Sequence, residues 1–244
     1  MQKVGVAVVS MILATGVTAF SLAKNKPVVD QSQMESVVEN YINNHPEAIF
    51  QALVKYRGIQ EEKALDATKN KALSMKDELF YKSGDPSMGN NNAPITIVEF
   101  MDYQCGYCKL MDSPLKEMVN NNPDKYRVVV KPVPFFGENS QVAATVAMAA
   151  SSASKFEAVH QALLQLKKPY KKEDMINILS KNGVKLNAKN FSSNVDATIQ
   201  LARALEVDST PWFFVHRKGS DQVHIIKGAM PAEAFKQKIQ NLTK

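Results

Sequence analysis

The spacing of hydrophobic residues changes from a helical period to a strand period near Ile95. Between residues 30 and 80, apolar side chains fall three or four positions apart, in two stretches that Asn44-His45-Pro46 separates. Their members are Met34, Val37, Val38, Tyr41 and Ile42, and then Ile49, Phe50, Leu53 and Tyr56. From Ile95 to Met101 most residues are β-branched, aromatic or otherwise apolar, which is typical of a short buried strand. The pattern predicts an N-terminal helical region followed by a domain with a sheet.

The two N-terminal helices carry start signals of their own. Ser32 and Glu35 have the spacing of a capping box, and Pro46 suits the first turn of the second helix because no N–H is needed there. The second helix becomes highly charged over residues 61–71, which predicts a solvent-exposed stalk. The first helix is too short to be stable alone, so its apolar stripe needs a partner. That partner is either a second copy, which would make residues 24–82 a dimerisation region, or the chain's own catalytic domain.

A segment rich in turn-forming residues, 83–94, predicts the start of a second domain over residues 83–244. In this domain the strand at Ile95 leads into a helix after Cys105, and a second strand follows from Tyr126 to Lys131. A strand, a helix and a strand in this order imply a parallel, right-handed unit. Pro114 should kink the helix or begin a fresh segment.

The pattern is helical throughout residues 138–206, which predicts a helical subdomain inserted between strands. It contains His160, which we expect to be packed and non-catalytic. Residues 212–216 and 222–227 then predict a hairpin, and residues 231–242 predict a closing helix. The sequence therefore indicates an α/β domain with a central helical insertion.

Composition and charge exclude some functions. Hydrophobic residues make up 45% of the 244 residues, which is ordinary for a globular protein. The net charge of +6 comes from dispersed lysines without interleaved aromatic residues, so we expect no nucleic-acid partner.

Residues 1–23 have the pattern of a cleaved signal peptide. Lys3 is followed by an uncharged apolar stretch and by small residues suited to cleavage, at Ala19 or Ala23. An uncleaved membrane anchor is the alternative, because about 20 apolar residues can span a bilayer. A lipoprotein anchor is excluded, since no cysteine lies near residue 20. Export would place the protein in an oxidising compartment.

The chain has two cysteines, Cys105 and Cys108, and they lie where the predicted strand gives way to a helix. A helix N-terminus carries unpaired N–H groups and partial positive charge, which favour a thiolate. Such a site lowers a cysteine pKa from about 8.5 to between about 3.5 and 7.5. We therefore expect Cys105 to be an exposed nucleophile and Cys108 to close a disulfide with it.

Two other interpretations of the cysteine pair are weaker. A structural zinc site needs four ligands, but the chain has one Cys-x-x-Cys pair and four scattered histidines. These are His45, His160, His216 and His224. A purely structural disulfide is also disfavoured, because so small a loop constrains the unfolded chain little.

The stretch from Phe100 to Lys109 resembles the active site of the thioredoxin superfamily, in particular the bacterial DsbA/DsbC/DsbG/ScsC group of thiol-disulfide oxidoreductases. A second motif, Ser209-Thr210-Pro211-Trp212, is similar to the cis-proline loop of that group. The resemblance implies a thioredoxin-like fold, a redox-active Cys105–Cys108 disulfide and a loop at Thr210 and Pro211 that binds the substrate strand. It implies no cofactor and no metal.

The finer features resemble the DsbC-type isomerases more than the strong oxidases. Gly106 and Tyr107 stand between the cysteines, and a threonine precedes the proline. Glu99 either faces inward, where it could relay a proton to Cys108, or is a surface carboxylate. The resemblance further implies cysteine-containing protein substrates, a membrane redox partner of the DsbB or DsbD type and a homodimer. It also implies a periplasmic location, with the outer membrane as an alternative.

A non-enzymatic envelope protein is the competing interpretation. In this case the chain would be a surface-exposed binder or chaperone with incidental thiols.

Overall fold

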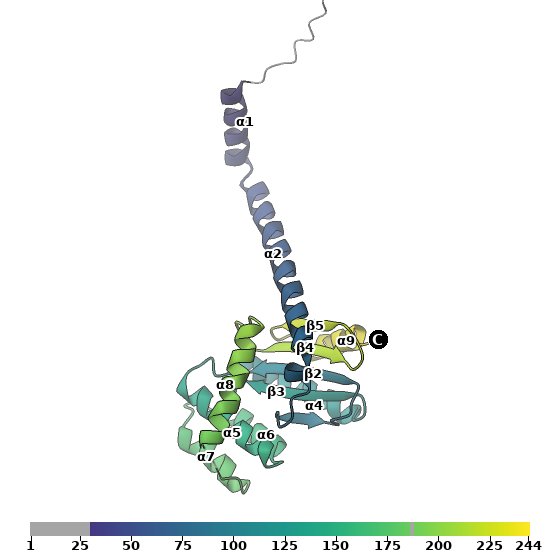
Figure 1. The fold of residues 1–244 in the computed structure, drawn as a ribbon. Coiled ribbons are helices and arrows are strands. Elements are labelled where there is room, and N and C mark those ends of the chain that lie inside the picture. The colour runs from purple at the N-terminus through teal and green to yellow at the C-terminus, as the bar shows by residue number, and fades with distance from the viewer. Residues whose placement is uncertain (1–29, 186–187) are drawn as a thin grey trace, which may run out of the picture. The chain divides into compact units, whose positions relative to one another are not determined.

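The computed structural model describes residues 30–185 and 188–244 (Figure 1). The expected signal peptide, residues 1–23, lies outside the described residues. The described part of the chain divides into two compact units, with the boundary between Tyr56 and Arg57. Among the described helices, none is both long and apolar enough to cross a membrane.

The first unit contains α1 (Gln31–Asn44) and the beginning of α2 (Pro46–Ser74), so the predicted break before Pro46 is confirmed. The predicted capping box is wrong. Asp30 caps α1, because its carboxylate accepts from the Ser32 N–H at 3.3 Å. Glu35 instead accepts from the Gln31 side chain at 2.9 Å. The N-cap thus lies two residues before the predicted one, and the Asp30 carboxylate satisfies the free N–H group of Ser32.

The second unit is built on a five-stranded mixed sheet of order β1-β3-β2-β4-β5. Its strands are β1 (Ser87–Gly89), β2 (Ile95–Met101), β3 (Tyr126–Pro132), β4 (Trp212–Arg217) and β5 (Val223–Lys227). The central pair β2 and β3 is parallel, as the sequence predicts, and the other pairs are antiparallel. All residues of β2 and β3 are buried, because helices cover both faces of the sheet.

The edge strand β1 lies inside residues 83–94, which were expected to form turns at the start of the second domain. It pairs with β3, and its last residue, Gly89, has a φ of +86°. A Cβ there would lie 2.6 Å from the Tyr126 carbonyl oxygen. Only glycine therefore fits this close approach.

The two faces of the sheet have separate hydrophobic cores. On one face α4 (Gly106–Asn121) and α9 (Ala232–Leu242) pack over Ile97, Met101 and Phe213. On the other face α3 (Lys76–Phe80) and α8 (Ala188–Ala204) pack over Val98, Phe100 and their neighbours. The two cysteines belong to the core under α4.

Helix α4 runs through Pro114 as a single element, so the expected fresh segment does not form there. A proline in a helix deprives the carbonyl four residues earlier of its bond. Here that carbonyl belongs to Leu110, which is 67% exposed, so water can bond it.

The predicted helical insertion is present between β3 and β4. It consists of α5 (Glu138–Ser152), α6 (Phe156–Gln165), α7 (Lys172–Lys181) and α8. Helix α5 is buried along most of its length and contacts α6, α7 and α8. The insertion therefore packs around one alanine-rich helix.

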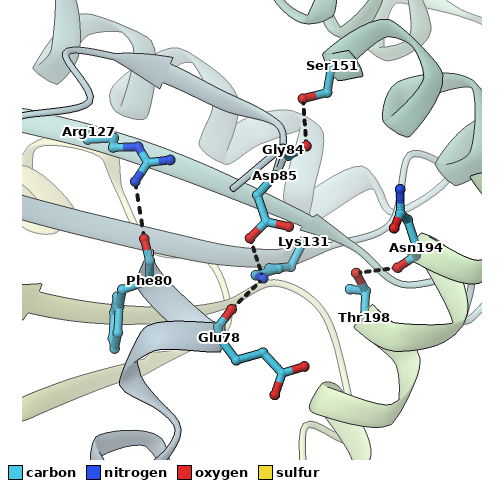
Figure 2. Close-up of polar contacts among 9 residues, drawn as sticks. All are labelled: Glu78, Phe80, Gly84, Asp85, Arg127, Lys131, Ser151, Asn194 and Thr198. Carbon is cyan, nitrogen blue, oxygen red and sulfur yellow. Dashed lines mark hydrogen bonds and ion pairs between the residues drawn. The ribbon is translucent and has the colours of Figure 1, made fainter. Parts of the chain in front are cut away.

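Buried cationic side chains of β3 form hydrogen bonds with α3 and hold it against the sheet, as Figure 2 shows. Lys131 Nζ donates to the Glu78 carbonyl at 2.9 Å and to the Asp85 carboxylate at 2.5 Å. Arg127 Nη1 donates to the Phe80 carbonyl at 3.2 Å. These donors satisfy carbonyls at the C-terminal end of a helix, where positive charge is favoured.

Candidate active site

Cys105 caps the N-terminus of α4, just after the turn that follows β2. Its N–H donates to the Asp102 carbonyl at 2.9 Å, and its carbonyl accepts from the Lys109 N–H at 3.2 Å. The first N–H groups of a helix have no intrahelical partner and carry partial positive charge. Cys105 thus occupies the position that the sequence predicts for an acidic thiol.

The turn before Cys105 is fixed by the buried carboxylate of Asp102. Its Oδ1 accepts from the Gln104 N–H at 2.8 Å and from the Ser140 hydroxyl at 2.7 Å. Its Oδ2 accepts from the Phe136 N–H at 3.2 Å. These bonds hold the turn in the conformation that places Cys105 at the start of α4.

The loop before β4 lies against the first cysteine, although it is about one hundred residues away in sequence. The Thr210–Pro211 peptide bond is cis, the conformation that the family resemblance implies. Cys105 Sγ lies 3.5 Å from the Thr210 carbonyl oxygen. The fold therefore brings together the two motifs that the sequence analysis singles out.

The pKa of Cys105 is lowered to about 5. Hydrogen bonding with the Cys108 thiol is the largest cause, and burial opposes it. Hydrogen bonds with the Thr210 side chain and the N–H groups of Cys108 and Tyr107 lower the pKa further. Cys105 is therefore a thiolate at neutral pH.

Cys108 is the protonated partner. It is 1% exposed, and burial strongly raises its pKa, with the hydrogen bond to Cys105 and the nearby Glu99 carboxylate adding to the effect. The two sulfurs therefore divide their roles, because one is held as a thiolate and the other as a thiol.

Glu99 points inward, so the surface alternative is wrong. In β2 it shares a face with Ile97 and Met101, which pack against α4. The side chain is 3% exposed, and Oε1 has no hydrogen-bond partner among the described residues. Burial raises the pKa of Glu99 well above its usual value, and the negative charges of Asp112 and Cys105 raise it further. A carboxyl group that resists ionisation thus lies under the redox helix.

The prediction that Cys105 is exposed is wrong. The residue is 5% exposed, because the Thr210 loop covers its sulfur. Tyr107, in the same turn, is 65% exposed, and a Cβ on Gly106 would meet open space. The nucleophile is thus largely covered, while Tyr107 between the cysteines faces solvent.

A buried polar chain lies beside the pair and was not predicted. The Tyr103 hydroxyl lies 2.9 Å from His160 Nδ1, and His160 Nε2 lies 3.1 Å from Asp112 Oδ1. His160 is thus packed, as expected, but it connects the insertion to α4. Asp112 stands four residues after Cys108, and this spacing on one helix face was the available signal.

No metal site is evident in the part of the chain that the structure describes. There, no three histidine, cysteine or acidic side chains come together as metal ligands would.

Comparisons with known proteins agree with this geometry. The family profile of the DSBA-like thioredoxin domain matches residues 96–240. Disulfide bond formation protein D of Bacillus subtilis (strain 168) is 25% identical over 178 residues, which cover 64% of this chain and 76% of that protein.

Solved structures are similar over most of the chain. A linker-deletion mutant of Proteus mirabilis ScsC has a TM-score of 0.67 and 25% identity, covering 88% of this chain and 97% of that one. A periplasmic thioredoxin-like protein from Salmonella enterica serovar Typhimurium has a TM-score of 0.59 and 29% identity, covering 68% and 94%.

The fold and the cysteine pair define a thiol-disulfide oxidoreductase. The chain belongs to the family of DSBA-like thioredoxin domains.

Proposed function

We propose that this oxidoreductase forms and isomerises disulfide bonds in exported proteins. The observation that carries the proposal is the opposed acidity of the two thiols, since the pKa of Cys105 is lowered to about 5 while that of Cys108 is raised. An acidic thiol is a good leaving group, so a mixed disulfide on Cys105 breaks readily.

Oxidation of a substrate takes two exchange steps. A substrate thiolate attacks Cys105 in the enzyme disulfide, so that an S–S bond to the substrate forms and Cys108 leaves as a thiolate. A second substrate thiolate then attacks the substrate sulfur and releases the Cys105 thiolate. The substrate loses two electrons, which the Cys105–Cys108 pair gains. A membrane partner of the DsbB type would reoxidise the pair.

Isomerisation uses the reduced pair and moves no net electrons. The Cys105 thiolate attacks an incorrect substrate disulfide, and the released substrate thiolate attacks another disulfide of the same protein. Release of Cys105 completes the exchange, and Cys108 resolves adducts that stall. A partner of the DsbD type would keep the pair reduced for this reaction.

Glu99 is the proton donor and acceptor for Cys108. A leaving Cys108 thiolate takes the Glu99 proton, and the Glu99 carboxylate takes it back when Cys108 attacks. Its depth, its free Oε1 and its raised pKa fit this exchange.

Extended polypeptide is the substrate form that the site fits. Thr210 and Pro211 precede a strand and lie at the sulfur, where their backbone groups can pair with an added strand. Large apolar side chains near the site are exposed, and they are suited to unfolded chains. They are Tyr107, Leu110, Phe135 and Phe136.

Reshuffling of scrambled ribonuclease tests the activity. We expect Cys105→Ser to abolish turnover and Cys108→Ser to accumulate mixed disulfides with substrate. Turnover that persists in Cys105→Ser would refute the nucleophile assignment. An oxidase that never isomerises would form disulfides in reduced ribonuclease but leave the scrambled form unchanged.

The N-terminal helices support self-association into a homodimer. Helix α1 buries no residue, and its apolar stripe is open, with Val37 68% and Tyr41 56% exposed. In the intact chain, Val37→Glu with Tyr41→Glu should reduce the sedimenting mass to that of a monomer. A wild-type chain that already sediments as a monomer would overturn this part. Cell fractionation tests the proposed periplasmic location against the outer membrane.

A further inference from the structure

Lysines are concentrated in the loop between α6 and α7, which we term the lysine loop (residues 166–172). Four of its seven residues are lysines, and all four are exposed. They are Lys167, Lys168, Lys171 and Lys172. None of them forms an ion pair with another described residue. Glu173 and Asp174 follow in the first turn of α7, where the helix end favours their charge, so the positive patch stops there.

The lysine loop is fastened to the redox helix. Lys109 Nζ donates to the Leu166 carbonyl at 2.9 Å and lies 5.0 Å from the centre of the Tyr170 ring. Asn139 Nδ2 donates to the Tyr170 carbonyl at 3.0 Å. These contacts come from α4 and α5, so the loop is held against these two helices at Leu166 and at Tyr170.

The anchor lies next to the nucleophile. The Lys109 N–H donates to the Cys105 carbonyl at 3.2 Å, so Lys109 is one helical turn from Cys105 on the same side of α4. The lysine loop therefore borders the redox site.

The lysines do not account for the acidity of Cys105. Its lowered pKa comes from hydrogen bonds with Cys108, Thr210 and the backbone of Tyr107. The positive charge of the loop lysines is thus available to a partner, because it does not pair with the Cys105 thiolate or with an acidic neighbour.

We propose that the lysine loop is a docking surface for acidic segments of polypeptide substrates, which enter the redox site from the α6–α7 side. The proposal rests on the proposed function, since the partner must bring a cysteine to Cys105. A polypeptide fits better than a lipid surface or a small anion, because the exposed Tyr107 and Leu110 on the same helix offer apolar contacts. Positive charge of this kind raises association rates and leaves the later chemistry unchanged.

Matched variants of the intact protein test the inference. In the loop variant Lys167, Lys168, Lys171 and Lys172 all become glutamine. In the control variant four exposed lysines elsewhere become glutamine: Lys181, Lys185, Lys218 and Lys238. Both variants lose the same net charge. Lys109 is kept, because it anchors the loop.

The probes are two synthetic peptides with one internal disulfide, flanked by aspartates in one and by lysines in the other. Reaction with the reduced enzyme is followed by stopped flow. At ~0.01 M salt we expect wild type to react with the acidic peptide about 10-fold faster than with the basic one. The preference should vanish at ~1 M salt, where charges are screened within ~3 Å. The control variant should keep the preference, and the loop variant should lose it.

Other outcomes overturn the inference. Equal losses in the two variants would assign the preference to net charge, and an unchanged preference in the loop variant would exclude the surface. A loop variant that loses only its binding to anionic phospholipid vesicles would assign the lysines to a membrane. The rate with an uncharged aromatic disulfide and the Cys105 pKa should be equal in all three proteins. If wild type reacts with no disulfide at all, the proposed function fails instead.

Discussion

The two faces of the central sheet both bury ionisable side chains, but they surround them differently. Under α4, Glu99 is 3% exposed and its Oε1 has no partner among the described residues. On the opposite face Lys131 is 1% exposed and donates to Glu78 and Asp85 (Figure 2). The first side chain is the one for which we propose a proton exchange with Cys108. The second holds a helix and a loop in place, so burial of charge alone does not mark a catalytic group.

The causes of the pKa shifts also differ between the buried side chains of the two faces. Burial raises the pKa of both Glu99 and Asp85, but Lys131 opposes the rise at Asp85, whereas Asp112 and Cys105 increase it at Glu99. Burial also lowers the pKa of Lys131. Asp85 thus has a neighbouring charge of opposite sign, whereas Glu99 has neighbouring charges of like sign.

The largest effect is expected from Asp85→Asn, which leaves Lys131 buried without a counter-charge. Breaking a buried pair in this way costs about 3–5 kcal/mol of the free energy of unfolding. Chemical denaturation should show this loss, while the reaction of Cys105 with iodoacetamide stays the same. Asp66→Asn is the control, because its ion pair with Lys69 is exposed and worth less than about 1 kcal/mol. Equal losses in the two variants would contradict the structural role of the buried pair.

The next effect is kinetic and is expected from Glu99→Gln. Without a proton acceptor for Cys108, resolution of a mixed disulfide should slow on the order of 10²-fold. Quenched-flow gels of the Cys105 adduct measure this rate. An unchanged rate would show that Glu99 does not accept the Cys108 proton and has only a structural role.

The pH dependence of folding stability is a second test of Glu99→Gln. Because the folded pKa of Glu99 is raised, the native state binds more protons than the unfolded state above about pH 4.3, the usual glutamate value. Stability from this group is therefore present at low pH and is lost as the pH rises through the folded pKa. The glutamine variant should lack this decline in denaturant melts taken across the pH range.

A smaller effect concerns the acidity of Cys105. Alkylation of the reduced enzyme should be half-maximal near pH 5, as the lowered pKa of Cys105 to about 5 requires. Cys108→Ser replaces the thiol that contributes most to this lowering with a hydroxyl, so the midpoint should move. A midpoint close to that of free cysteine in the wild type would refute the thiolate.

The smallest effect is expected from Gly106→Ala. A Cβ at this position meets no atom within 4 Å, so the change should add less than about 1 kcal/mol of helix stability. The alkylation midpoint should stay the same, because the hydrogen bonds that lower the Cys105 pKa come from Cys108, Thr210 and the Tyr107 N–H group, which a methyl group at position 106 leaves in place. A large change in the midpoint would show that Gly106 tunes the thiol.

Much of the fold could be predicted, because local signals and tertiary packing agree. The strand at Ile95, the helix after Cys105 and the helical insertion follow from hydrophobic spacing and are all present. Strand β1 was not predicted, because three residues between turns are too few to show the alternation of a strand. The cap of α1 was assigned to Ser32, since Asp30 and Ser32 could each serve and only geometry decides between them.

The site was predictable where its residues are close in sequence. The direction of Glu99 could not be inferred, because β2 is buried on both faces and shows no alternation. Tyr103, His160 and Asp112 were not linked, since the hydroxyl and the imidazole are 57 positions apart and nothing local indicates their contact.

The buried carboxylate of Asp102 has one more consequence. It binds the turn before Cys105 with one hydrogen bond and the start of the insertion, at Phe136 and Ser140, with two others. Excising the helices between β3 and β4 would remove the Ser140 hydroxyl from this buried carboxyl group, three residues before Cys105. The insertion is therefore not a removable module, because the beginning of α5 completes the hydrogen bonding of the turn before Cys105.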